Sequence, residues 1–306
     1  MGLTRQLGLA LNRCFSWNAT LSSLYLQTWA RALEFLPDGS WLKQHIGNNL
    51  QSSRWPAMEL PGRLVEWGSG VRGLLTPRPG SLGFRALYEQ RVTHEAWVFD
   101  FLGARFSRYD AVLEVGANIG LYTVFFSKLF ARRDGRLRVF SFEPSPRAFR
   151  CLEENLALND CANVMLFPKA VSATAGTADF HENPVDFMKG SLDRDAAGQF
   201  EGLAARPIEV GTLSGKEIAP LLASFSRILL KVDVVGSEPE VLASLGELLE
   251  QKRPDIVVGV WAQNLPGLNR LGLEKAYRIY RIDPGELLVR PSFTDTAYCN
   301  YFLEAK

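Results

Sequence analysis

The stretch that most constrains the fold is Ala111–Thr123, which reads AVLEVGANIGLYT. It predicts a buried strand over 111–115, a turn bounded by Gly116 and Gly120, and an apolar helix that runs to about residue 131. The two glycines permit a sharp turn and a close approach to a ligand, because they carry no Cβ. The unpaired N–H groups at the start of the helix point into that turn. This order of elements is typical of a nucleotide-type cofactor crevice, although ordinary strand-to-helix connections share it.

An acidic residue stands where such a crevice needs one. Glu143 ends a predicted second strand that starts at Leu137, and it lies 23 residues after Gly120 (143 − 120). Rossmann-type sites place a ribose-binding carboxylate about 20 residues after the glycine turn. The Pro-Ser-Pro sequence that follows predicts a new helix with Ser145 as its N-cap. We therefore expect the Glu143 carboxylate to accept hydrogen bonds from both ribose hydroxyls.

Two cofactors use this geometry, a nicotinamide dinucleotide and S-adenosylmethionine. The dinucleotide motif G-x-G-x-x-G has a glycine at its second conserved position, where this chain carries Asn118. A side chain there would crowd a pyrophosphate, which S-adenosylmethionine lacks. The sequence therefore favours S-adenosylmethionine and leaves a nicotinamide oxidoreductase as an alternative.

Composition excludes several classes of function. The formal net charge is +1 and there is no dense Lys/Arg run, so a nucleic-acid partner is not indicated. The four cysteines form no C-x-x-C pair and there are only three histidines, so neither a disulfide framework nor a metal site is expected. No apolar run is long enough to span a bilayer, and reduced thiols in a soluble, cytoplasmic protein are the expectation.

The chain divides into two expected parts. Residues 1–84 predict an appendage that is helical to about residue 50 and forms a hairpin between residues 61 and 80. Its first helix has an apolar face that could contact a membrane or a partner, but packing against the main domain is its expected use; this face contains Leu26, Trp29, Leu33 and Leu36. Residues 85–306 alternate strands with helices, which predicts a Rossmann-like, doubly wound, mostly parallel sheet.

Further strands are predicted over 164–171, 226–234, 254–261, 277–282 and 298–303, with helices over 88–106 and 268–275. A capping box in which Ser237 caps and Glu240 reaches back predicts the helix after the fourth strand. Residues 176–204 are polar with no clear period, as in many lids and binding loops. We expect this insertion and the appendage to select the acceptor.

As a set, these residues resemble the FkbM-type S-adenosylmethionine-dependent methyltransferases. The resemblance covers about residues 85–262. It implies a seven-stranded methyltransferase sheet and O-methylation of a hydroxyl on a sugar, a glycolipid or polysaccharide, or a secondary metabolite, so that the partner is a small-molecule or glycan acceptor. The matching residues are Tyr88-Glu89, Glu114–Thr123, Phe142–Pro146, Lys169–Ser172, Leu230–Glu238 and Pro254–Ile256.

Two positions depart from the family pattern. Val235 stands where the family usually has Glu, and Gly259 stands where members commonly have an acid near the end of the fifth strand. If those carboxylates orient the acceptor or take its proton, the alternative is a non-catalytic member that binds a cofactor or acts as a scaffold. The other interpretation is that the missing Glu does not contact the substrate in the family and only orients residues that do.

Three residues are candidates for the general base. Asp233 comes first, because it lies at the carboxyl end of the fourth strand, where open α/β sheets bind their ligands. A carboxylate in an apolar strand is costly unless it is used or paired, and its structural alternative is a buried pair with Lys231 on the same side of the strand. Glu238 starts the next helix, and His181 in the polar insertion suits proton transfer near neutral pH.

Cofactor contacts are expected around the glycine turn and after the second strand. Glu114 is the candidate for the methionyl amine, and Tyr122 could equally belong to the core. The expected set is Glu114, Gly116, Asn118, Gly120, Tyr122, Glu143 and Pro144.

Overall fold

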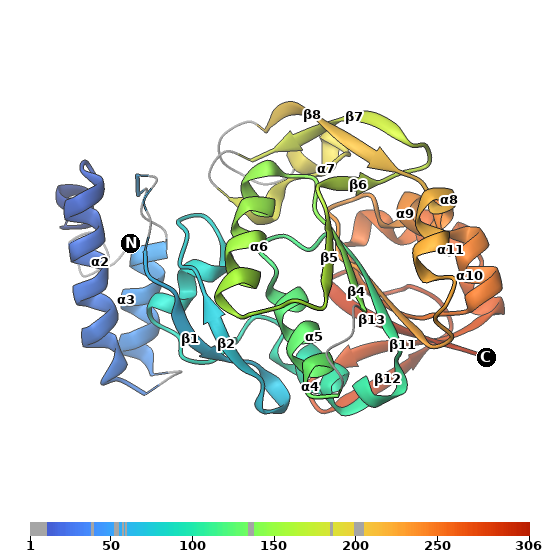
Figure 1. Ribbon diagram of the computed structural model, residues 1–306, viewed down its shortest axis with the longest axis horizontal. Helices are drawn as coiled ribbons and strands as arrows, with labels where there is room; N and C mark the ends of the chain where they lie inside the picture. Colours follow the sequence, from blue (N-terminus) through green and yellow to red (C-terminus); the bar gives the residue numbers. More distant parts are fainter. Residues whose placement is uncertain are drawn as a thin grey trace.

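The computed structural model describes residues 11–37, 40–51, 55–56, 58, 60–133, 138–183, 186–198 and 205–306 (Figure 1). The first residues of the expected N-terminal helix, the Asp38-Gly39 break, the start of the second strand at Leu137 and part of the polar insertion lie outside the described residues.

One large sheet organises the molecule. Its strands lie in the order β5 (Val164–Phe167), β4 (Val139–Phe142), β3 (Ala111–Val115), β9 (Ile228–Val232), β10 (Asp255–Val260), β13 (Cys299–Ala305), β11 (Tyr277–Asp283) and β12 (Glu286–Arg290). Neighbours from β5 to β10 are parallel, and β13 inserts antiparallel between β10 and β11. The Rossmann-like fold is confirmed. The strand count of seven is wrong, because an eighth strand, β12, pairs with β11 as a hairpin. The residues of β12 are half-buried or exposed, so no hydrophobic pattern predicted this strand.

Helices cover both faces of this sheet, so the doubly wound architecture is also confirmed. On one face lie α4 (Ala96–Arg105), α5 (Leu121–Ala131) and α6 (Pro146–Leu158), and on the other lie α8 (Gly215–Ile218), α9 (Glu238–Ser244), α10 (Gly246–Lys252) and α11 (Leu265–Arg270) (Figure 1). Successive strand residues point to opposite faces, as in a parallel sheet buried on both sides. Thus Val112 and Leu229 pack with the first group of helices, whereas Leu113 and Leu230 pack with the second.

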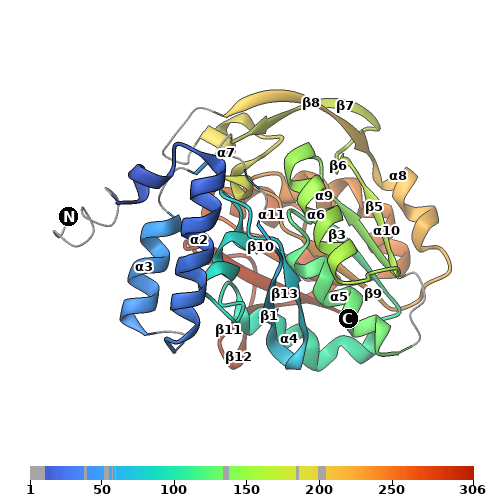
Figure 2. The ribbon, with the colours of Figure 1, turned by 60° about the vertical axis from the view of Figure 1, so that its left-hand side comes forward.

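A second sheet of three strands stands above the large one (Figures 1 and 2). Its strands lie in the order β6 (Lys169–Val171), β8 (Arg206–Leu213) and β7 (Gly176–Glu182). The short helix α7 (Arg194–Gly198) lies between β7 and β8 in the chain. The predicted single strand over 164–171 is therefore wrong. Pro168 has no N–H to donate to a ladder, and the chain leaves one sheet and enters the other at this residue. The polar insertion also contains a regular strand, β7, which its polar composition did not predict.

The N-terminal part has a small core of its own. It comprises α2 (Ala19–Glu34), α3 (Trp41–Gln51), β1 (Arg63–Glu66) and β2 (Arg72–Leu75), and the predicted hairpin is confirmed. Leu26 and Leu33 are buried against Phe84 and Leu87, with Trp29, Leu36 and Tyr88 in the same cluster. The predicted apolar face therefore packs inward. The boundary at residue 84 stays a prediction.

Two helix predictions need correction. The expected helix over 88–106 begins only at Ala96, and the helix after the fourth strand divides at Leu245 into α9 and α10. The capping box is wrong, because Ser237 at the N-cap has φ −101° and ψ 11° and its side chain makes no capping hydrogen bond. An N-cap normally has extended backbone that aims the hydroxyl at the first turn. None of the helices in the described part of the chain is long and apolar enough to cross a membrane.

Candidate active site

A cavity of about 390 Å³ opens at the carboxyl ends of the parallel strands. Its floor comes from the residues that follow β3, β4, β9 and β10, and its roof comes from the three-stranded sheet and residues 187–192. Open α/β sheets bind their ligands at this edge. Among the predicted site residues, the cavity brings together Gly116, Asn118, Glu143, Pro144 and Asp233.

The glycine turn is required by its surroundings. Gly116 has φ +86°, and a Cβ there would overlap the backbone oxygen of Asp233. Gly120 has φ +85°, and a Cβ there would overlap the side chain of Leu152, so Gly120 shapes the turn without lining the cavity. Asn118 also adopts a left-handed conformation, with φ +50°, and its Nδ2 donates to the Phe187 oxygen at 2.9 Å. Its side chain therefore ties the turn to the roof.

Glu143 lies in the cavity wall, held by the backbone of two adjacent loops. Its Oε2 accepts from the N–H of Asn118 at 2.7 Å, and its Oε1 accepts from the N–H of Ser145 at 2.8 Å. Burial raises the pKa of Glu143 to about 7, against these two hydrogen bonds, which lower it. A carboxylate has about four lone-pair sites, so two remain for a ligand. The Ser145 hydroxyl accepts from the N–H of Ala148, which confirms the predicted N-cap.

Asp233 is paired with Lys231 and also lines the cavity, and its role as a base stays a prediction. Its Oδ2 accepts from Lys231 Nζ at 2.8 Å, and the Lys231 side chain is only 2% exposed. The Asp233 side chain is 34% exposed and lines the cavity. Lys231 Nζ also lies 4.0 Å from the centre of the Tyr122 ring. A buried lysine thus fixes the carboxylate from below while its other oxygen remains accessible from the cavity.

Tyr298 lies next to Gly259, at the end of the fifth parallel strand. A Cβ at Gly259 would lie 2.7 Å from the Tyr298 hydroxyl and 3.1 Å from Asp233 Oδ1. The Tyr298 hydroxyl donates to Glu95 Oε1 at 2.8 Å. The absence of a side chain at Gly259 is therefore a packing requirement of this site.

Glu95 is a buried carboxylate that sequence reasoning missed. It precedes α4 with φ +52° and accepts from Tyr298, from the Tyr122 hydroxyl at 2.6 Å and from Asn300 Nδ2 at 2.6 Å. Burial opposes its ionisation, but His94, Lys231 and these donors together hold the pKa of Glu95 below its usual value. The two ends of the Tyr298 contact are 203 residues apart, so no local pattern could have revealed it.

Two more cavity residues were also missed. His94 lines the cavity, and Trp261 lies beside Tyr298 with ring centroids 4.8 Å apart. His94 lies within the helix predicted over 88–106 and Trp261 ends a predicted strand, and neither position carries a chemical signal by itself. An aromatic corner of Trp261 and Tyr298 therefore adjoins Asp233 in the cavity wall.

Besides Gly120, four other predicted site residues lie outside the cavity. Glu114 is buried beneath the turn, where its Oε2 accepts from the hydroxyls of Thr123 and Ser141, each at 2.7 Å. Desolvation raises the pKa of Glu114, although Lys231 opposes the shift. This contradicts the expected contact with a methionyl amine, because a sealed side chain cannot reach a ligand.

Tyr122, Glu238 and His181 complete this group. Tyr122 is a core residue of α5. Glu238 is buried, accepts from Asn264 Nδ2, and has a pKa raised well above its usual value by desolvation. His181 belongs to β7, where its backbone pairs with Ser191. None of the three lines the cavity, so the structure does not place Glu238 or His181 as a base.

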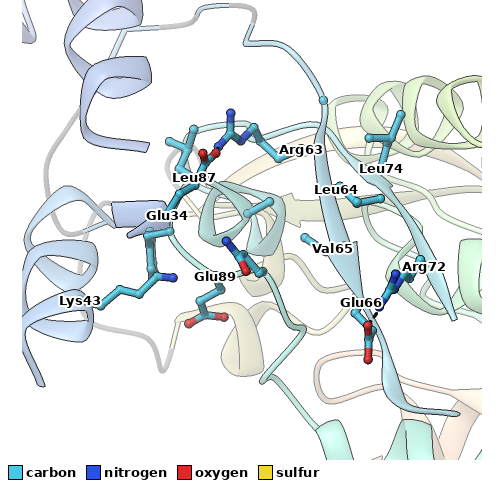
Figure 3. A pocket seen from close by; sticks show the side chains of 14 residues that line it. Glu34, Lys43, Arg63, Leu64, Val65, Glu66, Arg72, Leu74, Leu87 and Glu89 are labelled. Atoms are coloured by element: carbon cyan, nitrogen blue, oxygen red, sulfur yellow. Dashed lines mark hydrogen bonds and ion pairs between the residues drawn. The ribbon is translucent and has the colours of Figure 1, made fainter. Parts of the chain in front are cut away.

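A larger cavity, of about 580 Å³, lies between the N-terminal helices and the hairpin. Four of its charged side chains form two pairs: Arg63 contacts Glu34, and Arg72 contacts Glu66 at 2.8 Å (Figure 3). It contains neither the glycine turn nor Glu143. We therefore place the active site in the smaller cavity. The described residues contain no group of three or more His, Cys, Asp or Glu side chains that could hold a metal ion.

Residues 114–274 match the family described as the methyltransferase FkbM domain, which is more than half of the chain. The chain belongs to the FkbM methyltransferase family. It is therefore an enzyme, a methyltransferase, as the motifs around Gly116, Glu143 and Asp233 implied. The match ends before β11, so the closing strands and the N-terminal part lie outside it.

Two curated proteins are similar to this FkbM methyltransferase. Methyltransferase sdnD of Sordaria araneosa is 29% identical over 196 residues, which cover 56% of this chain and 74% of that protein. The hexuronic acid methyltransferase AglP of Haloferax volcanii is 28% identical over 143 residues, which cover 46% of this chain and 52% of that protein.

Among solved structures, an FkbM methyltransferase from Methylobacillus flagellatus is similar at 15% identity and a TM-score of 0.42, over 72% of this chain and 52% of that chain. The chain spans about half the length of that protein and of AglP.

Proposed function

We propose that the protein transfers a methyl group from S-adenosylmethionine to a hydroxyl of a sugar, a glycolipid or polysaccharide, or a secondary metabolite. The observation that carries the proposal is the pair of carboxylates, Glu143 and Asp233, on the walls of one cavity at the switch edge of a Rossmann-like sheet. Glu143 suits the ribose, and Asp233 suits the acceptor.

The residues present fit this cofactor. The volume of about 390 Å³ falls within the usual range of small-molecule sites. Glu143 keeps two lone-pair sites for the ribose hydroxyls, and Asn118 keeps its side chain on the roof and out of the cavity floor. Ser237 lines the cavity, and its hydroxyl is buried and has no hydrogen-bond partner among the described residues. Buried polar groups are seldom left unpaired, so this hydroxyl supports a polar ligand.

Methyl transfer asks little covalent chemistry of the protein. S-adenosylmethionine, when bound, supplies a methyl group that its sulfonium already activates. Orientation of the acceptor oxygen contributes about 7–11 kcal/mol to such reactions, and a general base adds about 10²–10⁴-fold. Asp233 takes the proton of the acceptor hydroxyl, while Lys231 holds the Asp233 carboxylate in place. The roof of the cavity, which includes residues 187–192, excludes water.

The part of the cavity around Asp233, where we place the acceptor, suits a ring-shaped substrate with polar groups. Trp261 and Tyr298 present aromatic surface beside Asp233, and His94 offers a polar side chain on the same cavity. A sugar ring combines an apolar face with hydroxyl edges, which suits an aromatic surface next to a carboxylate. The similarity to a hexuronic acid methyltransferase supports the same substrate class.

The test has a binding part and a turnover part. Isothermal titration with S-adenosylmethionine should show binding that Glu143→Ala abolishes, and a thermal-shift comparison with NAD should favour S-adenosylmethionine. With radiolabelled cofactor, a library of glycans and glycolipids should reveal methyl acceptors. Asp233→Asn should remove turnover and keep cofactor binding, whereas Asp160→Asn on the exposed surface should change neither. Turnover unaffected by Asp233→Asn would refute the base assignment.

A further inference from the structure

Helix α2 carries a second apolar face, which points away from the protein. Among the described residues, twelve large hydrophobic side chains are exposed, and seven of them lie between residues 11 and 42. Trp17 is 73% exposed, Leu24 is 66% exposed, and Phe35 is 89% exposed. Single exposed apolar residues are ordinary, but a contiguous group of this kind marks an interaction surface.

The exposed side chains form one row along the helix. From Leu21 to Phe35 they follow one another in steps of three and four residues, which places them on the same side of α2, and Trp17 lies in the turn just before the helix. All are exposed, whereas Leu26, Ala30 and Leu33 face the core. We call this row the outer stripe: Trp17, Leu21, Leu24, Thr28, Arg31 and Phe35. Figures 1 and 2 show α2 and α3 together at the edge of the molecule, away from the large sheet.

The charges near the outer stripe have one sign. Residues 1–33 contain Arg5, Arg13 and Arg31 and no Asp or Glu. The first acid, Glu34, is paired with Arg63 of the hairpin. From Trp17 to Phe35 arginine is the only charge apart from the paired Glu34, and a helix of this kind with Trp, Phe and Leu on one face has the composition of helices that lie in a membrane interface. Trp is also enriched at the level of lipid headgroups.

We propose that the outer stripe docks the protein on the surface of an anionic membrane. Trp17, Leu24 and Phe35 enter the boundary between headgroups and acyl chains, and Arg31 reaches the lipid phosphates through its flexible stem. A second copy of the chain fits this surface less well. It would bury Arg31 in an apolar seam without an acidic partner, because the outer stripe contains no Asp or Glu.

The experiment is co-sedimentation of the full chain with vesicles of phosphatidylcholine that contain phosphatidylglycerol, against vesicles of phosphatidylcholine alone. The wild type should pellet with the anionic vesicles, and the combined variant Trp17→Ser, Leu24→Ser and Phe35→Ser should bind at least tenfold more weakly. Arg31→Glu should remove the preference for anionic lipid. Circular dichroism should show the same helix content in every variant.

A matched control carries three serines at exposed apolar sites of the main domain, Trp97→Ser, Met165→Ser and Val289→Ser. It should bind vesicles like the wild type. Three results would overturn the proposal: a wild type that stays in the supernatant with both vesicles, equal loss of binding in the control, or a wild-type dimer in light scattering that the stripe variant converts to a monomer without any vesicle binding. The outcome does not depend on methyl transfer.

Discussion

The titration of Glu143 provides the sharpest test of cofactor binding. Burial raises its pKa from the ordinary value of 4.5 to about 7. The ionised group can accept from both ribose hydroxyls, whereas the protonated group uses one oxygen as a donor. At about pH 5.5 only about 3% of the carboxyls are ionised, so the affinity for S-adenosylmethionine should be about thirtyfold lower than above about pH 8.

The same titration has the opposite sign for the stability of the free protein. Between 4.5 and about 7 the folded state holds the proton more tightly than the unfolded chain does. The free energy of unfolding therefore falls as the pH rises through this window, by about 3 kcal/mol in total. Cofactor affinity should thus increase with pH while the stability of the free protein decreases.

Glu143→Gln removes the titration and keeps the size of the side chain. Its oxygen can replace one of the two backbone hydrogen bonds from Asn118 and Ser145, but its NH₂ group then faces the other N–H, at a cost of about 1–3 kcal/mol. Isothermal titration across about pH 5.5–8.5 should show weak binding whose residual pH dependence belongs to the ligand. Urea unfolding measures the stability trend.

The control for this series is Glu153→Gln, which changes an exposed glutamate on α6. It should reproduce both wild-type profiles. If Glu143→Gln bound the cofactor with wild-type affinity and the same pH profile as the wild type, Glu143 could not be the ribose ligand.

Three further substitutions test other parts of the site. Gly116→Ala should cost about 3 kcal/mol or more in urea unfolding, because it adds a Cβ at positive φ against the backbone of Asp233; wild-type stability would refute this requirement. Gly259→Ala should lower kcat about tenfold to a hundredfold by displacing Tyr298 and Asp233, with cofactor affinity unchanged in titration; an unchanged kcat would show that this corner does not orient the acceptor. His181→Ala should keep kcat within about twofold, since its side chain does not line the cavity; a large loss would restore it as a candidate base.

Local signals in the sequence predicted the glycine turn and the position of Glu143 at the cavity. The turn at Gly116 and Gly120 is a backbone requirement, and such requirements leave glycines at fixed positions. Glu143 ends a strand next to a helix start, so its place at the cavity follows from the order of elements along the chain. Pro168 was also visible, and it could have shown that the third strand divides there.

The acceptor side could not be predicted in the same way. It is assembled from the residue before α4, the end of β10 and the start of β13, which are remote in the sequence. Glu114 illustrates the opposite error. It has the residue type and position of a ligand, but Thr123 and Ser141 enclose its carboxylate, and burial depends on packing that a strand pattern does not encode.

One of the two departures from the family pattern, Gly259, has an explanation in this corner of the molecule. Gly259 leaves the space that the Tyr298 hydroxyl fills, and that hydroxyl is bonded to Glu95. The fifth strand has no acid here, but the Glu95 carboxylate, which precedes α4, lies close to the same corner. It accepts from the Tyr298 hydroxyl, and Tyr298 lines the cavity. Because Asp233 has both a lysine partner and access to the cavity, our proposal that Asp233 is the base does not require an acid at position 235 or 259.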